Sequence, residues 1–249
     1  MPTACAELLL IDNSNSFTKF ALSSRTAVLR ARKLPTREVS PEALTKTLRG
    51  WRFEAAVLSS VVPEKGAIIE THLRGVKVLR VSATVQLGVG IDYPRPATIG
   101  ADRLANAASV AALFGAPAVV VDFGTAVSFD IISREKNYVG GVIAPGLEAM
   151  TDYLHQRTAL LPKISLLEPP SAIGKSTRHA MLAGAVYGYR GLVREILNQI
   201  TRELGPGKKP KIIATGGYAE LIAAGLPEIH SVEPGLTLEG LRIIGGLNL

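Results

Sequence analysis

The chain has 249 residues, of which 47% are hydrophobic, and its 28 Lys and Arg residues exceed its 21 Asp and Glu residues to give a net charge of +7. This length fits two modest lobes better than one large core. The positive charge suits an anionic ligand, but no basic stripe is interleaved with aromatic residues, so we expect no nucleic acid partner.

The single cysteine, Cys5, excludes a disulfide or a thiolate metal site built within the chain. It favours a reducing, cytoplasmic location. No run approaches the roughly 18 apolar residues that a membrane span needs, so we expect no membrane association.

In the first half of the chain, aliphatic runs typical of strands alternate with helical patterns. The expected strands are 8–11, 19–22, 28–32, 55–60 and 76–81. One helix begins near Pro41, and another lies between the last two strands. The stretch 85–98 is rich in glycine and proline and predicts a long loop, a kind of segment that is often functional. An Ala-rich helix over 101–114 leads into the second half.

Two segments, 8–18 and 118–128, are variations on one another 110 positions apart. In each, an aliphatic strand ends on an aspartate, Asp12 or Asp122, and a turn of small or hydroxylated residues leads to a second apolar strand. Two such turns around one cleft would offer backbone N–H groups, hydroxyls and carboxylates, which suit a polyphosphate and its cation. The repeat predicts a duplicated α/β fold and nucleotide-dependent phosphoryl transfer, although an aspartate at a strand end is also an ordinary turn residue.

Gly100, Ala101, Asp102 and Arg103 place an acid and a base side by side where a helix begins. Asp102 there either caps the helix and favours its dipole or orients and deprotonates a substrate hydroxyl. Arg103 is suited to a carboxylate, because its planar guanidinium makes a two-pronged contact. The two interpretations of Asp102 are not exclusive.

Together these motifs resemble those of the type III pantothenate kinases, in order and spacing over nearly the whole chain. The matching segments are Asp12–Ser16, Ser59–Pro63, Gly100–Arg103, Val121–Ala126, Gly140–Gly146, Thr158–Pro162, Gly174–Thr177, Ala214–Gly217 and Leu236–Leu241. The resemblance implies the duplicated actin-like (ribonuclease H-like) fold of the acetate and sugar kinase, Hsp70 and actin superfamily, with two lobes of mixed sheets flanked by helices. We expect an N-terminal lobe over 1–114 and a C-terminal lobe over 115–249.

The resemblance also implies ATP-dependent phosphorylation of pantothenate to 4′-phosphopantothenate, the first step of coenzyme A biosynthesis, with Asp102 as the catalytic base. The residues implied to bind ATP are Asp12, Asn13, Ser14, Asn15, Ser16, Phe17, Thr18, Lys19 and Thr125. Those implied to bind pantothenate are Tyr93, Gly100, Ala101, Asp102, Arg103 and Thr177. Asp122 resembles the ligand of a monovalent cation, K⁺ or NH₄⁺, and ATP brings Mg²⁺. Tyr93 alone would also fit a packing aromatic.

Thr177 resembles a residue that reaches into the site of a neighbouring subunit, so we expect a homodimer. It opens an apolar-rich helical stretch whose small residues would let two helices approach closely. The residues noted in this stretch are Ala180, Ala183, Val186, Tyr187 and Leu192. A helix buried within one chain explains the same pattern.

One position departs from the family pattern. Ser14 stands where the first turn usually has Gly, whereas Gly124 keeps the corresponding place in the second turn. If that position requires a positive φ, Ser costs on the order of 1 kcal/mol there. The departure leaves open a non-catalytic relative that acts as a transcription accessory factor. A kinase of the same superfamily with another small-molecule substrate is the other alternative.

Overall fold

The computed structural model describes residues 6–207 and 209–249, so Cys5 lies outside the described residues. The chain forms two compact units. The first contains the residues up to Gly115 together with Lys136–Val139 and Gly235–Leu249, and the second contains Ala116–Glu135 and Gly140–Pro234. The change of unit after Gly115 falls close to the predicted boundary. The chain returns to the first unit at its end, which the predicted lobes 1–114 and 115–249 do not include.

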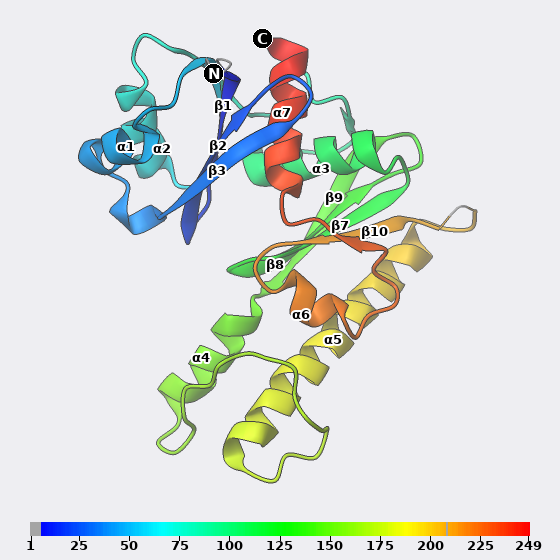
Figure 1. Cartoon of the computed structure of the whole chain (residues 1–249). Coiled ribbons are helices and arrows are strands. Elements are labelled where there is room, and N and C mark those ends of the chain that lie inside the picture. The colour runs from blue at the N-terminus through cyan, green and yellow to red at the C-terminus, as the bar shows by residue number, and fades with distance from the viewer. Residues whose placement is uncertain (1–5, 208) are drawn as a thin grey trace. The chain divides into compact units, whose positions relative to one another are not determined.

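Each half of the chain opens with three consecutive strands, and helices and further strands follow (Figure 1). The strands are β1 (Ala6–Asn13), β2 (Phe17–Ser23), β3 (Val28–Pro35), β4 (Phe53–Ser60), β5 (Lys77–Arg80), β6 (Gly90–Ile91), β7 (Ala118–Phe123), β8 (Ala126–Ile132), β9 (Asn137–Pro145), β10 (Lys211–Thr215) and β11 (Ser231–Val232). The α-helices are α1 (Pro41–Leu48), α2 (Pro63–His72), α3 (Ala101–Leu113), α4 (Leu147–Arg157), α5 (Thr177–Glu203), α6 (Ala219–Ala223) and α7 (Leu236–Asn248). Two short 3-10 helices are η1 (Thr36–Glu38) and η2 (Pro96–Thr98).

The two sheets repeat one topology. The first has the order β3-β2-β1-β4-β5, and the second has the order β11-β10-β7-β8-β9-β6. When the strands are numbered from β1 and from β7, both sheets contain the order 3-2-1-4-5. In both, the first strand is antiparallel to the second and parallel to the fourth. The predicted duplication and the predicted mixed sheets are therefore confirmed.

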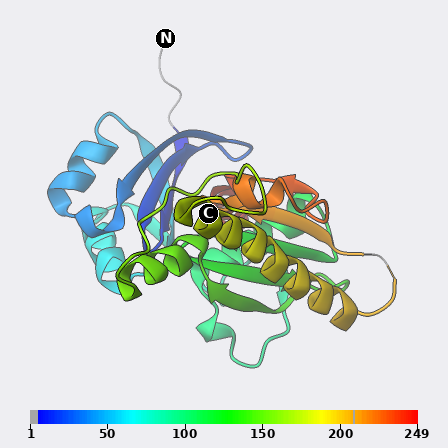
Figure 2. The same cartoon turned by 90° about the horizontal axis from the view of Figure 1, so that it is seen from below.

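Strand β1 of the first sheet is buried on both faces. Leu9 and Ile11 of β1 belong to a core cluster with residues of α1 and α2. Leu8 and Leu10 alternate with them and are also buried, and Gly245 of α7 packs against Leu8 on that side. Figures 1 and 2 show α1 and α2 beside each other next to this sheet. Burial on both faces explains the unbroken aliphatic run in the sequence.

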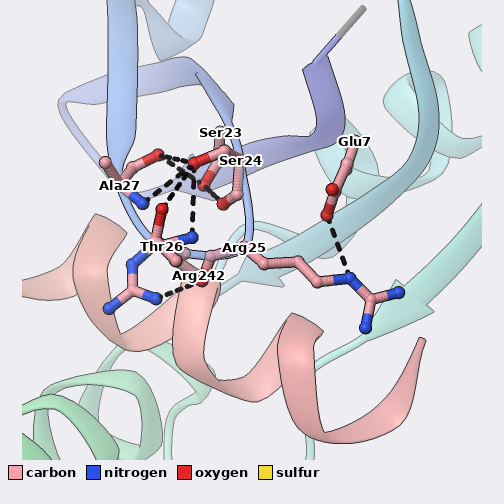
Figure 3. Close-up of polar contacts among 7 residues, drawn as sticks. All are labelled: Glu7, Ser23, Ser24, Arg25, Thr26, Ala27 and Arg242. Atoms are coloured by element: carbon pink, nitrogen blue, oxygen red, sulfur yellow. Dashed lines mark hydrogen bonds and ion pairs between the residues drawn. The ribbon is translucent and has the colours of Figure 1, made fainter.

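The C-terminal helix α7 is tied to the turn between β2 and β3 (Figure 3). Arg242 of α7 donates to the carbonyl oxygen of Arg25 at 2.6 Å, and the Arg25 side chain pairs with Glu7 of β1. Within the turn, the Ser24 hydroxyl accepts from the backbone N–H of Ala27 at 3.1 Å. These contacts, with the packing of α7 on β1, explain why the last residues of the chain fold with the first unit.

In the second unit, α5 packs against both α4 and α6 (Figures 1 and 2). Tyr189 of α5 is buried, and its ring lies 6.3 Å from that of Phe123 on β7. Its hydroxyl donates to the carbonyl oxygen of Pro145, the last residue of β9, at 3.0 Å. The long helix α5 thus contacts the ends of both β7 and β9.

The predicted strands and helices are confirmed in order, and most extend a few residues further than the sequence pattern indicated. The predicted loop 85–98 contains β6 and η2. Within the described part of the chain, no helix combines the length and the apolar character needed to cross a membrane.

Candidate active-site residues

The first turn joins β1 to β2 and carries Asp12 at its base. Asp12 is 2% exposed, and its Oδ1 accepts a hydrogen bond from Ser14 Oγ at 2.6 Å. Its Oδ2 lies 3.5 Å from Nζ of Lys19, which is the residue opposite Asp12 in the antiparallel register. The Lys19 side chain is 40% exposed. The buried carboxylate of Asp12 and the partly exposed ammonium group of Lys19 therefore lie close together at the base of the turn.

Asn13 and Thr18 close the base of the same turn. They are opposite each other in the β1–β2 register, and Asn13 Nδ2 donates to Thr18 Oγ1 at 2.8 Å. Asn13 Oδ1 accepts from Ser60 Oγ of β4 at 2.7 Å. Asn13 is 1% exposed and Thr18 is fully buried, whereas Asn15, Ser16 and Phe17 are exposed. Asn13 and Thr18 therefore support the turn from below, and the exposed residues present its surface.

Ser14 does not strain the turn. In the described part of the chain, Lys136 is the one residue other than glycine with a positive φ, and Gly124 is not among the positive-φ glycines either. The condition under which Ser14 would cost free energy is thus not met. The serine instead places a hydrogen-bond donor on the buried Asp12 carboxylate.

Asp102 lies in the first turn of α3, and Gly100 is the N-cap residue of that helix. Asp102 Oδ1 accepts from the backbone N–H of Arg103 at 2.8 Å, so the carboxylate does interact with the helix start. Burial is the largest cause that raises the pKa of Asp102 above its ordinary value, and the negative charge of Asp12 raises it further. The hydrogen bond from Arg103 opposes both. A raised pKa brings a carboxylate closer to the range useful for a general base.

Arg103 and Tyr93 are connected through an aromatic residue that we did not single out in the sequence. Tyr138, 1% exposed, lies on β9. The guanidinium carbon of Arg103 is 5.7 Å from its ring centre, and the Tyr93 ring meets it edge to face at 6.1 Å. Asp92, the residue before Tyr93, is also bound to Tyr138, because its backbone N–H donates to the Tyr138 carbonyl oxygen at 2.9 Å. No motif marked Tyr138, because only the fold brings it near the other two.

The second turn, between β7 and β8, carries Asp122 and Thr125. Asp122 is partly exposed, Thr125 is exposed, and Asp122 is opposite Thr215 in the parallel β7–β10 register. Gly216 comes directly after Thr215, the last residue of β10, and has a φ of +95°. A Cβ at Gly216 would lie 2.6 Å from Asp122 Oδ1. Only glycine leaves space for this carboxylate.

Thr177 is the first residue of α5 and is exposed. The preceding Ser176 caps the helix, since its hydroxyl accepts from the backbone N–H of His179 at 3.3 Å. Near this helix end, α4 and α5 line an apolar cavity of about 720 Å³. Its lining residues are Pro145, Ala149, Met150, Thr151, Tyr153, Leu154, Ala180, Met181, Gly184 and Ala185.

The long helix α5 divides the residues that we noted for close helix approach. Ala183 and Val186 are buried within their own unit, whereas Ala180 and Tyr187 are exposed. The burial of Ala183 and Val186 is therefore what a helix packed within its own chain predicts. The exposed face instead continues through Gly184 and other small residues.

The predicted site residues thus fall into two groups. The first unit holds Asp12 to Lys19, Tyr93 and the Gly100–Arg103 segment, and the second holds Asp122, Thr125 and Thr177. Among the described residues, no group of three or more His, Cys, Asp or Glu side chains could hold a metal ion. Any cation at these turns would be held by single carboxylates together with other oxygen atoms.

Comparison with solved structures shows the fold. A protein from Sinorhizobium meliloti described as a 2-dehydro-3-deoxygalactonokinase has a TM-score of 0.61 at 13% identity, with 96% of this chain and 95% of that chain covered. A protein from Campylobacter jejuni described as a Baf family transcriptional activator has a TM-score of 0.59 at 19% identity, with 95% and 96% covered. The fold is the duplicated actin-like α/β fold that the resemblance implied.

Sequence comparison shows the family. A type III pantothenate kinase from Akkermansia muciniphila is 56% identical over 243 residues, which cover 97% of this chain and 99% of the relative. A type III pantothenate kinase from Methylacidiphilum infernorum is 42% identical over 238 residues, covering 96% and 88%. The family model for type III pantothenate kinase matches residues 8–199, which include both turns and the Gly100–Arg103 segment. The chain therefore belongs to the type III pantothenate kinase family.

Proposed function

We propose that this chain transfers the γ-phosphoryl group of ATP to the hydroxyl group of pantothenate to form 4′-phosphopantothenate, the first step of coenzyme A biosynthesis. Beyond family membership, one observation carries the proposal. Asp102 is a carboxylate with a raised pKa, and the negative charge of Asp12 in the first turn contributes to that rise. Arg103 follows Asp102 directly in the sequence. A base, a phosphate-binding turn and a cation for the substrate carboxylate are then present in one unit.

In this proposal Asp102 accepts the proton of the pantothenate hydroxyl as that oxygen attacks the γ-phosphorus. Phosphoryl transfer passes through a loose transition state, so most of the rate comes from alignment and charge neutralisation. Arg103 holds the pantothenate carboxylate, and the Tyr138 ring, which the Tyr93 ring meets edge to face, limits how far its guanidinium can move. Holding the carboxylate at one end places the hydroxyl at the other end against Asp102.

The nucleotide is assigned to the two turns. Lys19 and the N–H groups of the first turn face the phosphates, and Thr125 contacts ATP from the second turn. Mg²⁺ in proteins is usually held by one or two carboxylates together with phosphate oxygens, and Asp12 is the carboxylate at the first turn. Mg²⁺ bound with ATP neutralises charge on the phosphates.

We assign Asp122 to a monovalent cation, K⁺ or NH₄⁺. The close approach of Gly216 to the Asp122 carboxylate supports this, because it places backbone rather than a side chain beside that negative charge. Such a cation would offset the negative charge of the phosphates. A cytoplasmic location, where ATP and potassium are abundant, also belongs to the proposal.

We further propose a homodimer in which Thr177 contributes to the partner's pantothenate site. Thr177 is exposed at the start of α5, and α4 next to it presents Met150, Tyr153 and Leu154 at exposures of 39%, 59% and 41%. Large apolar side chains around a cavity are typical of a surface that a second chain covers. The small exposed residues of α5 would allow close approach of a helix.

The alternative of a non-catalytic accessory factor rested on Ser14, and that residue causes no backbone strain. The structural likeness to a transcriptional activator concerns the fold alone. A kinase for a neutral sugar would give Arg103 no carboxylate to bind. Neither alternative therefore has an observation in its favour at the candidate site.

The test is to incubate the purified chain with ATP, Mg²⁺, K⁺ and pantothenate and to search for 4′-phosphopantothenate by mass spectrometry. We expect product with the native chain and a large loss with Asp102→Asn. Hydrolysis of ATP without phosphopantothenate, or equal product from both proteins, would contradict the proposal.

A further inference from the structure

We propose that Thr36 is a positioning residue for the nucleotide, an inference that rests on the proposed function of the first turn. Thr36 begins η1 directly after β3 and is 3% exposed. It binds the first turn in two places. Its Oγ1 donates to the carbonyl oxygen of Ser14 at 2.6 Å, and its backbone N–H donates to the carbonyl oxygen of Ser16 at 3.0 Å.

These two bonds set the orientation of the peptide groups in the turn. In a trans peptide the C=O and the following N–H point in opposite directions, and the one cis peptide in the described chain lies elsewhere, at Ala116–Pro117. Because the carbonyls of Ser14 and Ser16 point toward Thr36, the N–H groups of Asn15 and Phe17 point away from it. Thr36 therefore fixes the orientation of two peptide groups in the turn that is proposed to bind the phosphates.

Proton counting shows that Thr36 ends a directed chain of hydrogen bonds. A threonine hydroxyl has one proton, and that of Thr36 is used on Ser14. In its 3.0 Å contact with Thr18, Thr36 must therefore accept, and Thr18 must donate. Thr18 in turn accepts from Asn13 Nδ2, and Asn13 Oδ1 accepts from Ser60.

This chain runs from β4 through β1 and β2 to η1, and its three central members are almost fully buried. With the bonds in the stated direction, the side-chain donors of Asn13, Thr18 and Thr36 each have an acceptor. A satisfied buried network of this kind allows a single arrangement. The turn is consequently held rigid before any nucleotide arrives, which reduces the entropy lost on binding.

The duplicated fold supports the inference independently. Gly146 follows β9 as Thr36 follows β3, and each comes directly after a proline. A Cβ at Gly146 would lie 2.7 Å from the Gly124 carbonyl oxygen and closer still to that of Thr125. The residue after the third strand thus packs against turn carbonyls in both units. In the first unit, Thr36 makes this contact with its hydroxyl and its backbone N–H. In the second unit, the backbone of Gly146 packs directly against the turn.

The test compares Thr36→Val, which removes the hydroxyl at nearly constant shape, with Thr36→Ser, which keeps it. Binding of Mg²⁺–ATP to the full chain is measured by calorimetry without pantothenate, and the KM for pantothenate is measured at saturating ATP. We expect Thr36→Val to weaken ATP binding about tenfold, since it leaves the Ser14 carbonyl without its donor and Thr18 without its acceptor. The KM for pantothenate should stay within about twofold.

Thr45→Val is the matched control, because the Thr45 hydroxyl is exposed and donates only to Pro41 within α1 at 2.9 Å. It should bind ATP like the native chain. Thr36→Ser should bind ATP within about threefold of native, because the donor remains.

Loss of ATP affinity below about threefold in Thr36→Val would overturn the inference, and so would equal losses for ATP and pantothenate. If Thr36→Val does not fold, Thr36→Ser decides, since a loss greater than about threefold in that variant contradicts the role of the hydroxyl. These results are separate from the proposed function itself, which fails if the native chain binds ATP but forms no phosphopantothenate.

Discussion

Asp12 at the end of β1 lies near enough to Asp102 at the start of α3 for its charge to help raise the pKa of Asp102. Burial of Asp102 is the larger cause, and the N–H of Arg103 opposes both. Two carboxylates in one buried region are costly unless a cation or a proton lies nearby. The raised pKa makes the charged form of Asp102 costly to stability and useful as a base.

Asp102→Asn should lower kcat by about 10²–10⁴-fold, because the amide cannot accept the hydroxyl proton. The same change should raise the melting temperature at pH 7. Folding raises the pKa of Asp102, so the stability linked to its protonation is present below the unfolded-state pKa and is lost as the pH rises through the folded-state value. Asparagine carries no charge at any of these pH values.

Steady-state kinetics and thermal unfolding at several pH values check this prediction. The stability gain of Asp102→Asn should shrink as the pH falls, and the native activity should decline at acid pH as Asp102 becomes protonated. Glu54→Gln, at an exposed position of β4, is the control and should change neither quantity. Activity of Asp102→Asn within threefold of native would remove Asp102 from the role of base.

Asp122→Ala should lower activity and abolish any difference between potassium and sodium buffers. The reason is that a monovalent ion held beside the phosphates would lose its one carboxylate ligand. Initial rates in matched potassium and sodium chloride measure this directly. Asp152→Asn, in α4, serves as the control and should keep the native salt preference. Equal native rates in both salts would argue against a cation site at Asp122.

Arg103→Lys should raise the KM for pantothenate more than the KM for ATP. Lysine keeps the charge, but it replaces a planar two-pronged contact with a point charge and loses the stacking on Tyr138. Pantetheine, which lacks the carboxylate, should be affected less than pantothenate. If both substrates suffer alike, Arg103 supports structure or phosphate binding instead.

Gly146→Ala should disrupt the second turn, because its Cβ would collide with the carbonyl oxygens of Gly124 and Thr125. We expect a loss of ATP affinity. We also expect a lower melting temperature, because an overpacked site lowers the free energy of unfolding by roughly 1–3 kcal/mol. Gly191→Ala is the matched control, since a Cβ on that exposed helical position meets nothing within 4 Å. Normal ATP binding by Gly146→Ala would show that the turn does not depend on this packing.

The proposed homodimer makes a complementation test possible. Asp102→Asn and Thr177→Glu should each be inactive alone. In a hybrid dimer, one of the two sites would combine native Asp102 from one chain with native Thr177 from the other. Random exchange of equal amounts should therefore restore about a quarter of native activity. A monomer by light scattering, with no rescue on mixing, would refute the shared site.

The strands, the two turns and the start of α3 were predictable because their signals are local. An aliphatic run ending on Asp12 or Asp122 is followed at once by its turn, and the repeat of this pattern indicated the duplication. Gly100–Arg103 likewise carries its helix start and its charged pair within four residues. Short-range periodicity and turn chemistry suffice for features of this kind.

Other features depended on contacts between residues that are distant in the sequence. Helix α7 joins the first unit through Arg242 and the turn at Arg25, a partnership that no periodicity encodes. Tyr138 becomes the link between Tyr93 and Arg103 only because β9 passes beside them within the first unit.

The sequence by itself determined the duplicated strand–turn–strand pattern and the position of each candidate group along the chain. The tertiary structure alone decided the environments that give these groups their chemistry. It partly buries Asp102 within reach of the charge of Asp12, and it places Thr36 against the carbonyl oxygens of the first turn. Burial and electrostatic reach are properties of three-dimensional packing among distant segments, so they follow from the fold and not from the order of residues in any one motif.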